Sequence, residues 1–400
     1  MPSITLITLH TPTPENVRAA SALPYHLIGA RPKNVKVIIY SYNLNQIERE
    51  EIIKIEKDLD VTIFTLSISK FVRSLLSKKG SFLRAILSRP ALNYLELPSE
   101  IQKKILSHSD YIWIYGEDIG HFSKYFNAFI SCVVTGPDCE ALYYWRMLGC
   151  PEKLNKFFTI VRYSRAYGHY LSLTKDLPYK NVFYHLVGDE DAKYLTKVNS
   201  KLNVEFINHP HYEGNLDREI GFSSPKIRLL ISGRNDFYVE KGINEAIGAL
   251  IEHSELRESY SVTFQGKGWS PLANKLRGAN YEVTEVGFVT SYKDELCCHD
   301  VLLSTIGVGT GTKGKVLDAF INGLLVVGTL RSVENIQVRD KEHYFLYEEK
   351  EDLIKILKWI ATHKEQAEKI AISGRERVLQ EHGIKHVSDL FYSLFPNLKK

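Results

Sequence analysis

The sequence lacks the marks of several protein classes. Its five cysteines are odd in number and show no metal or redox spacing, so we expect reduced thiols and a cytoplasmic protein. No run of 18 apolar residues occurs, which argues against a membrane-spanning helix. The net charge of +4 is too small to indicate a nucleic-acid partner. The first ten residues, MPSITLITLH, lack the basic segment and cleavage site of a signal peptide, so we interpret them as a strand.

The remaining composition is that of a globular protein. Hydrophobic residues make up 44% and charged residues 24% of the 400 residues, which allows two domains with a core each. Strand-like and helix-like segments alternate along both halves, and this alternation predicts an α/β fold with parallel sheets. A polar, turn-rich stretch at residues 211–225 is the expected linker between a first domain, 1–210, and a second, 226–383.

The strands of this pattern are apolar runs bounded by turn residues. In the first half they are Ile4–Leu9, Val35–Tyr40, Val61–Leu66, Tyr111–Tyr115, Ile130–Thr135 and Val182–Val187. In the second half they are Ile227–Ser232, Ser261–Gln265, Tyr281–Phe288, Val301–Leu303 and Leu324–Val327. Helical spacing predicts the longer helices Val17–Ile28, Gln46–Lys57, Leu154–Leu171, Asp352–Ile360 and Lys364–Gln380.

Residues 301–329, VLLSTIGVGTGTKGKVLDAFINGLLVVGT, are the most informative stretch. An apolar strand is followed by four glycines within eight residues, then by a helix that ends at Asn322-Gly323, and then by another strand. A glycine loop that opens a helix presents backbone N–H groups and the positive helix end to an anion. We therefore expect a phosphate site here, although such a loop could also serve only tight packing between strand and helix.

Two nucleotide motifs compete for these glycines. Gly309–Gly314 satisfies the dinucleotide spacing G-x-G-x-x-G, with Glu334 about where a ribose carboxylate should fall. The same residues with Lys315 match a P-loop, but Val316 stands where a Ser or Thr should hold magnesium. Both motifs usually follow the first strand of a nucleotide domain, whereas this loop lies three-quarters of the way along the chain.

A third interpretation is a family resemblance. The pattern Gly-x-Gly-Thr-x-x-Lys-x-x-Asp-Ala of residues 309–319, followed by Gly-x-x-Val-Val at 323–327, resembles the donor-site signature of GT-B glycosyltransferases. It is most similar to the large retaining family that includes sucrose synthase and many bacterial surface-sugar transferases. Gly233-Arg234 and Lys241-Gly242 resemble the first donor loop of that family. The resemblance implies two Rossmann-like domains that face each other across a cleft, with a C-terminal helix in 384–400 that returns to the first domain.

The resemblance also implies roles for individual residues. Those that would bind the co-substrate, a nucleoside-diphosphate sugar, are Arg234, Lys241, Val289, Gly309, Gly311, Thr312 and Lys315. Asp318 falls on a family glutamate that contacts ribose, and Thr310 replaces a glutamate that many members place near the donor sugar. Asp138 resembles an acidic position of the acceptor side, with the capping of the next helix as the alternative.

These residues define the expected chemistry. Negative charge grows on the diphosphate as the glycosidic bond breaks, so preorganised cations stabilise the departing group and no metal or other cofactor is expected. We expect a hexosyltransferase-type enzyme, retaining by family habit, that builds surface polysaccharide or lipid-linked glycan. A GT-B sugar-nucleotide epimerase and a non-catalytic sugar-nucleotide-binding relative remain open, and a dinucleotide-dependent dehydrogenase ranks last.

The stretch Lys70–Arg89 has a composition of its own. It carries six Lys or Arg, no carboxylate and many apolar residues, interrupted at Lys79-Gly80. One interpretation is peripheral contact with the inner face of an anionic membrane, where a lipid-linked glycan acceptor would lie. The other is a solvated helix whose apolar face packs on its own domain.

Overall fold

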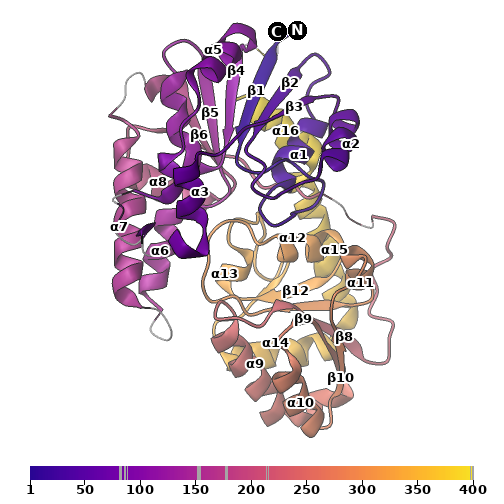
Figure 1. Ribbon diagram of the computed structural model, residues 1–400. Coiled ribbons are helices and arrows are strands. Elements are labelled where there is room, and N and C mark those ends of the chain that lie inside the picture. The colour runs from indigo at the N-terminus through magenta and orange to yellow at the C-terminus, as the bar shows by residue number, and fades with distance from the viewer. Residues whose placement is uncertain are drawn as a thin grey trace. The chain divides into compact units, whose positions relative to one another are not determined.

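The computed structural model describes residues 1–80, 83–84, 87, 89–150, 155–175, 179–212, 214, 216–396 and 398. The chain forms two compact units, Met1–Pro210 with Ile384–Lys400 and His211–Gly383. Each unit is built on one parallel sheet with helices on both faces (Figure 1). The predicted α/β class with parallel sheets is confirmed.

The sheet of the first unit has seven strands in the order β3-β2-β1-β4-β5-β6-β7. Their bounds are β1 Ser3–Thr8, β2 Lys36–Ser41, β3 Thr62–Thr65, β4 Tyr111–Tyr115, β5 Ser131–Gly136, β6 Val182–Leu186 and β7 Asn203–Phe206. The strand order reverses between β1 and β4, which makes the carboxyl ends of these two strands a topological switch point.

Helices bury both faces of this sheet, which explains the continuous apolar character of its strands. One face packs against α1 (Ala22–Gly29), α2 (Arg49–Leu59) and α16 (Ile384–Tyr392). The other packs against α3 (Lys70–Leu76), α5 (Ser99–His108), α6 (Glu140–Leu148), α7 (Lys156–Ser172) and α8 (Asp189–Val198). Short 3₁₀ segments are η1 (Lys78–Gly80), η2 (Ala91–Tyr94), η3 (Glu117–Tyr125) and η4 (Tyr179–Asn181).

The sheet of the second unit has six strands in the order β10-β9-β8-β11-β12-β13. They are β8 Ile227–Arg234, β9 Tyr260–Lys267, β10 Glu282–Val286, β11 Val301–Ser304, β12 Leu325–Gly328 and β13 Phe345–Leu346. Its helices are α9 (Glu240–Glu252), η5 (Ser254–Glu258), α10 (Ser270–Gly278), α11 (Tyr292–Cys297), α12 (Gly314–Ile321), α13 (Leu330–Val333), α14 (Lys350–Thr362) and α15 (Lys364–His382).

The first predicted helix differs from the observed one. We expected helix from Val17, but α1 begins at Ala22. The side-chain oxygen of Asn16 accepts hydrogen bonds from the backbone N–H groups of Ser21 and Ala22, at 3.1 and 3.0 Å. These bonds hold the preceding segment as a loop, because a local side-chain acceptor competes with the helical pattern.

The basic stretch Lys70–Arg89 is also not one helix. Its described helix, α3, ends at Leu76, and Ser81, Phe82, Ala85, Ile86 and Ser88 lie outside the described residues. Val72 and Leu75 are buried in the unit. Three other apolar side chains of the stretch, Phe71, Leu76 and Leu83, are exposed. Packing on the domain therefore accounts for part of its apolar surface.

Candidate functional site

The glycine loop of the second unit connects β11 to α12. Gly309 and Gly311 adopt positive φ angles of 145° and 66°, which residues other than glycine rarely adopt. The ammonium of Lys313 donates to the carbonyls of Thr310 at 2.6 Å and Gly311 at 2.9 Å. These bonds fix the turn from which α12 begins, so Gly309, Gly311 and Thr312 lie on a defined loop at the N-terminus of that helix.

A second loop, between β8 and α9, lies against the glycine loop. The N–H of Gly307 donates to the carbonyl of Tyr238 at 2.9 Å. A Cβ added to Gly242, in the first turn of α9, would stand 2.8 Å from the carbonyl oxygen of Thr305. β8 and β11 are neighbours in the sheet, so both loops leave the carboxyl ends of adjacent parallel strands. Ligands of open α/β sheets bind at such edges.

Lys315 extends from the glycine loop's helix toward the second loop. It lies in the first turn of α12, and its Nζ is 3.6 Å from the position that a Cβ on Gly233 would take. The same Nζ lies 5.5 Å from the ring centroid of Tyr292, whose hydroxyl is hydrogen-bonded to Ser232 at 2.9 Å. Burial lowers the pKa of Lys315, and the neighbouring Asp318 opposes that shift. The cation is thus directed toward the end of β8.

Asp318 lies one turn further along α12. Burial raises the pKa of its carboxyl to about 7, and Lys315 acts in the opposite direction. Asp318 in turn contributes to the raised pKa of Tyr292, although burial is the larger cause there. A carboxyl with this pKa changes its protonation near neutral pH, and perturbed groups of this kind cluster at functional sites.

The other proposed donor residues lie around these loops. Arg234, at the end of β8, and Lys241, in the first turn of α9, are both exposed. Val289 follows β10 and is half-buried, next to Phe288, which is 96% exposed. All proposed donor residues belong to the second unit.

Asp138 is placed apart from them, in the first unit. It is exposed, follows β5 and directly precedes Cys139, the N-cap residue of α6. The structure therefore collects Thr310, Asp318 and the donor residues on one unit and leaves Asp138 on the other.

Sequence reasoning missed Tyr292, Ser232 and Lys313 as parts of this site. Tyr292 lies beside the Lys315 cation but belongs to a different helix, α11, so no local sequence motif indicates it. Lys313 could have been suspected, since it stands inside the glycine motif and follows two glycines that need an ordered turn.

Comparisons with known proteins relate this chain to glycosyltransferases. Residues 243–392 match the family described as glycosyl transferase-like. A glycosyltransferase from Rickettsia africae ESF-5 superposes with a TM-score of 0.64 at 12% identity over 99% of each chain. Sucrose-phosphate synthase from Thermosynechococcus elongatus gives 0.66 at 13% identity over 98% of each chain. Anabaena HepE in complex with UDP gives 0.61 at 12% identity, covering 98% of this chain and 99% of HepE.

The chain has the GT-B fold, and the resemblance expected from the sequence is confirmed. No curated protein sequence matches the chain. Within the described residues, no group of three or more His, Cys, Asp or Glu is arranged to hold a metal ion. In that same part of the chain, every helix is too short or too polar to cross a membrane.

Proposed function

We propose that the protein is a glycosyltransferase that moves a sugar from a nucleoside diphosphate to an acceptor hydroxyl. The glycosyl transferase-like match, residues 243–392, contains the glycine loop and most of the second loop's helix. The fold is shared with glycosyltransferases, among them HepE, whose structures hold UDP and UDP-glucose. UDP is therefore the nucleotide to test first.

One observation carries this proposal. Lys315 holds its ammonium beside Gly233, where the glycine loop and the second loop are hydrogen-bonded to each other. Two backbone loops, a helix N-terminus and a cation together suit a diphosphate. As the bond from the anomeric carbon to the diphosphate oxygen breaks, negative charge collects on the leaving group. Lys315, with Arg234 and Lys241 near the same strand end, would stabilise that charge without reorganisation.

The finer parts of the proposal concern stereochemistry and cofactors. We propose retention at the anomeric carbon, with Asp318 bound to the ribose and Asp138 on the acceptor side. The anomeric configuration of the product, read by NMR, tests retention. Three cations supply the charge that a metal supplies elsewhere. Turnover in excess EDTA should therefore match turnover without it, and a loss that Mg²⁺ restores would overturn this part.

The first experiment is a thermal-shift panel with UDP, GDP, ADP, NAD and ATP. A ligand that binds only the folded state raises the melting temperature. At a concentration of 100 times its Kd, it adds about 2.7 kcal/mol to the free energy of unfolding. We expect a shift with one nucleoside diphosphate that Lys315→Ala removes. Lys275→Ala, which removes an exposed cation of α10, should keep the shift. A shift with NAD or Mg-ATP alone would overturn the proposal.

Activity separates the remaining alternatives. Release of UDP from a UDP-sugar, dependent on an acceptor, supports transfer. Isomerisation of the UDP-sugar without acceptor would indicate an epimerase. Nucleotide binding without turnover of any UDP-sugar would indicate a non-catalytic relative. Thr310 would then be the residue to examine, because many family members have an acid at this position.

We further propose that the acceptor is a glycan of surface polysaccharide or a lipid-linked glycan. Exposed Phe71, Leu76 and Leu83 stand among the cations of Lys70–Arg89. This surface suits peripheral contact with an anionic bilayer, where apolar side chains insert and cations pair with headgroups. Co-sedimentation with phosphatidylglycerol vesicles, reduced in Phe71→Ser and absent with phosphatidylcholine vesicles, would support the contact.

A further inference from the structure

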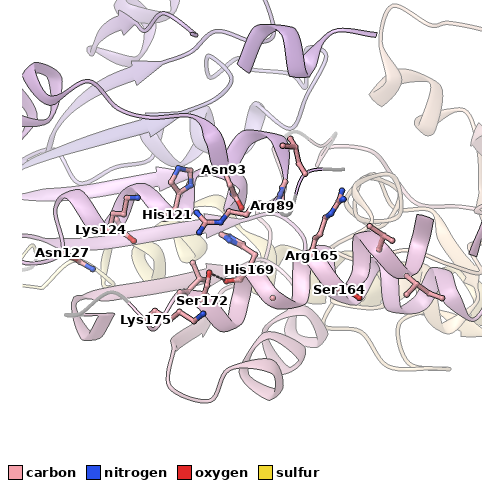
Figure 2. A pocket seen from close by; sticks show the side chains of 17 residues that line it. Arg89, Asn93, His121, Lys124, Asn127, Ser164, Arg165, His169, Ser172 and Lys175 are labelled. Carbon is pink, nitrogen blue, oxygen red and sulfur yellow. Dashed lines mark hydrogen bonds between the residues drawn. The ribbon is translucent and has the colours of Figure 1, made fainter. Parts of the chain in front are cut away.

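The first unit contains a cavity of about 800 Å³ between η2, η3 and α7. Figure 2 shows its lining, which includes eight side chains that carry nitrogen. Six of them matter here: Arg89, His121, Lys124, Arg165, His169 and Lys175. None of the residues named above for the donor site lines it. It is therefore a second candidate site, separate from the glycine loops.

The charge on this lining has one sign. Four of its side chains are Lys or Arg, and no Asp or Glu is among the described residues that line it. Burial lowers the pKa of His169 to about 4, and repulsion by His121 and Arg89 adds to the shift. Burial also lowers the pKa of His121, with smaller contributions from Lys124 and Arg89. At neutral pH the imidazoles are neutral, and the cations create a positive potential that a bound anion would relieve.

Backbone carbonyls hold two of these side chains in place. Arg165 donates from Nη1 to the carbonyl of Arg84 at 2.8 Å, which ties α7 to the segment before η2. The ring Nε2 of His121 lies 3.0 Å from the carbonyl of Leu95, to which it donates as the neutral tautomer. Preorganised donors of this kind lose little entropy when a ligand arrives.

Neutral polar groups complete the lining. Asn93 donates from its amide to the carbonyl of Asp118 at 2.7 Å. Its buried side-chain oxygen has no hydrogen-bond partner in the described part of the chain. Asn93 therefore keeps an unused acceptor in the wall of the cavity. Asn127 and Ser172 add an amide and a hydroxyl on the same lining. Cations beside hydroxyl-binding groups match a sugar that carries negative charge.

A neighbouring hollow of about 720 Å³ shares the lining residues Arg89 and Arg165 with this cavity. The second hollow adds Arg84 and Arg162, with Glu140 as its carboxyl among the described lining residues. Burial raises the pKa of Glu140 to about 7, so this carboxyl carries only part of a charge at neutral pH. We call these two hollows together the basic groove.

We propose that this basic groove binds an anionic oligosaccharide, one whose sugars carry carboxylate or phosphate groups. Its volume lies within or above the ~300–1,000 Å³ of small-molecule sites. Arginine forks bind both carboxylate and phosphate in pairs of parallel hydrogen bonds. That the bound saccharide is the acceptor or growing product of sugar transfer rests on the function proposed above; the binding itself does not.

The test is calorimetric titration with trigalacturonate, glucose 6-phosphate, inorganic phosphate and the neutral trisaccharide maltotriose. It uses the whole 400-residue chain with Lys315→Ala, so that phosphate groups bind less to the glycine loop. We expect trigalacturonate or glucose 6-phosphate to bind at least tenfold more tightly than maltotriose and inorganic phosphate. The affinity should fall as salt rises, because the attraction is ionic.

Variants then locate the site. Arg165→Gln and, separately, Lys175→Gln, which changes an exposed side chain, should each weaken the saccharide at least fivefold. Lys103→Gln, which removes an exposed cation of α5 in the same unit, should bind as the parent does. The proposal would be overturned if all variants bound the saccharide with equal affinity, or if maltotriose bound as tightly as trigalacturonate. It would also be overturned if the protein bound phosphatidylglycerol vesicles and none of these saccharides. Saccharide binding with no turnover of any UDP-sugar would instead contradict the proposed transferase and leave this site standing.

Discussion

The backbone N–H of Gly307 donates a 2.9 Å hydrogen bond to the carbonyl of Tyr238. This bond joins the loop after β11 to the loop after β8, so the two halves of the proposed diphosphate site form one piece. Close backbone approach beside it requires glycine at Gly242, where α9 passes the carbonyl of Thr305. The geometry of the proposed site therefore depends on backbone contacts between the two loops.

The substitution Gly242→Ala tests that approach. Its Cβ would stand 2.8 Å from the Thr305 oxygen, a backbone atom that can move only with its strand end. We expect a loss of about 1–3 kcal/mol in the free energy of unfolding, measured by urea titration, together with weaker UDP binding. Gly248→Ala is the matched control in the same helix, with no atom within 4 Å of the new Cβ. It should stabilise by up to ~1 kcal/mol through helix propensity. Similar effects of the two substitutions would contradict the packing.

Lys313→Ala tests whether the glycine loop is preorganised. The variant loses the bonds from Nζ to the carbonyls of Thr310 and Gly311, each worth on the order of 1 kcal/mol. We expect faster amide hydrogen exchange in residues 307–313 and a loss of affinity for UDP of about tenfold. Lys275→Ala should change neither quantity. Unchanged exchange with a large loss of affinity would show instead that Lys313 contacts the nucleotide directly.

Asp318→Asn tests the raised pKa of this carboxyl by the pH dependence of stability. The folded state holds the proton up to about pH 7, whereas the unfolded chain releases it near 3.8. The folded state thus binds more protons between these values, so the contribution of Asp318 to the free energy of unfolding falls as pH rises from about 4 to 7. Asparagine has no proton to lose.

The stability of Asp318→Asn relative to the parent should therefore increase between pH 5 and pH 8. The increase should be about 2–3 kcal/mol, since two pH units lie between pH 5 and the pKa of about 7, and each corresponds to about 1.4 kcal/mol. Chemical denaturation at both pH values measures it. Glu282→Gln, at the exposed edge strand β10, is the control for a general charge effect. A difference that stays constant or reverses with pH would contradict a carboxyl that stays protonated up to about pH 7.

The sequence predicted the framework well where its signals are local. The end of α12 at Asn322-Gly323 was expected, and Gly323 has the positive φ of 73° that a helix stop of this kind needs. The start of α1 was misplaced because Asn16 caps the N–H groups of Ser21 and Ala22 from a distance that periodicity does not register.

The basic groove was missed for a different reason. Arg89, His121 and His169 come from three segments that only the folded chain brings together, and each is unremarkable in its own segment. The same holds for Tyr292 beside Lys315. Local spacing predicts a glycine loop at the start of a helix, because closely spaced glycines determine its backbone geometry. It does not find sites whose specificity comes from side chains on distant elements.

Phe391→Ala tests the packing of α16 on the first unit. The ring of Phe391 is fully buried, 4.7 Å from Trp113 and 5.2 Å from His185 between ring centroids. Removing it should cost about 3–5 kcal/mol, because a cavity would open against the sheet. Leu390→Ala is the matched control, since its neighbouring side chain is 41% exposed and should change stability by less than ~1 kcal/mol.

Hydrogen exchange of the backbone amides of β4, Tyr111–Tyr115, measured across a urea titration, follows the first unit and distinguishes this effect from a change in the second unit. In Phe391→Ala the transition of that signal should move to lower urea, while the UDP-dependent stabilisation of the second unit persists. Equal shifts in Phe391→Ala and Leu390→Ala would mean that the C-terminal helix contributes little packing energy, although its ring contacts place it in the core.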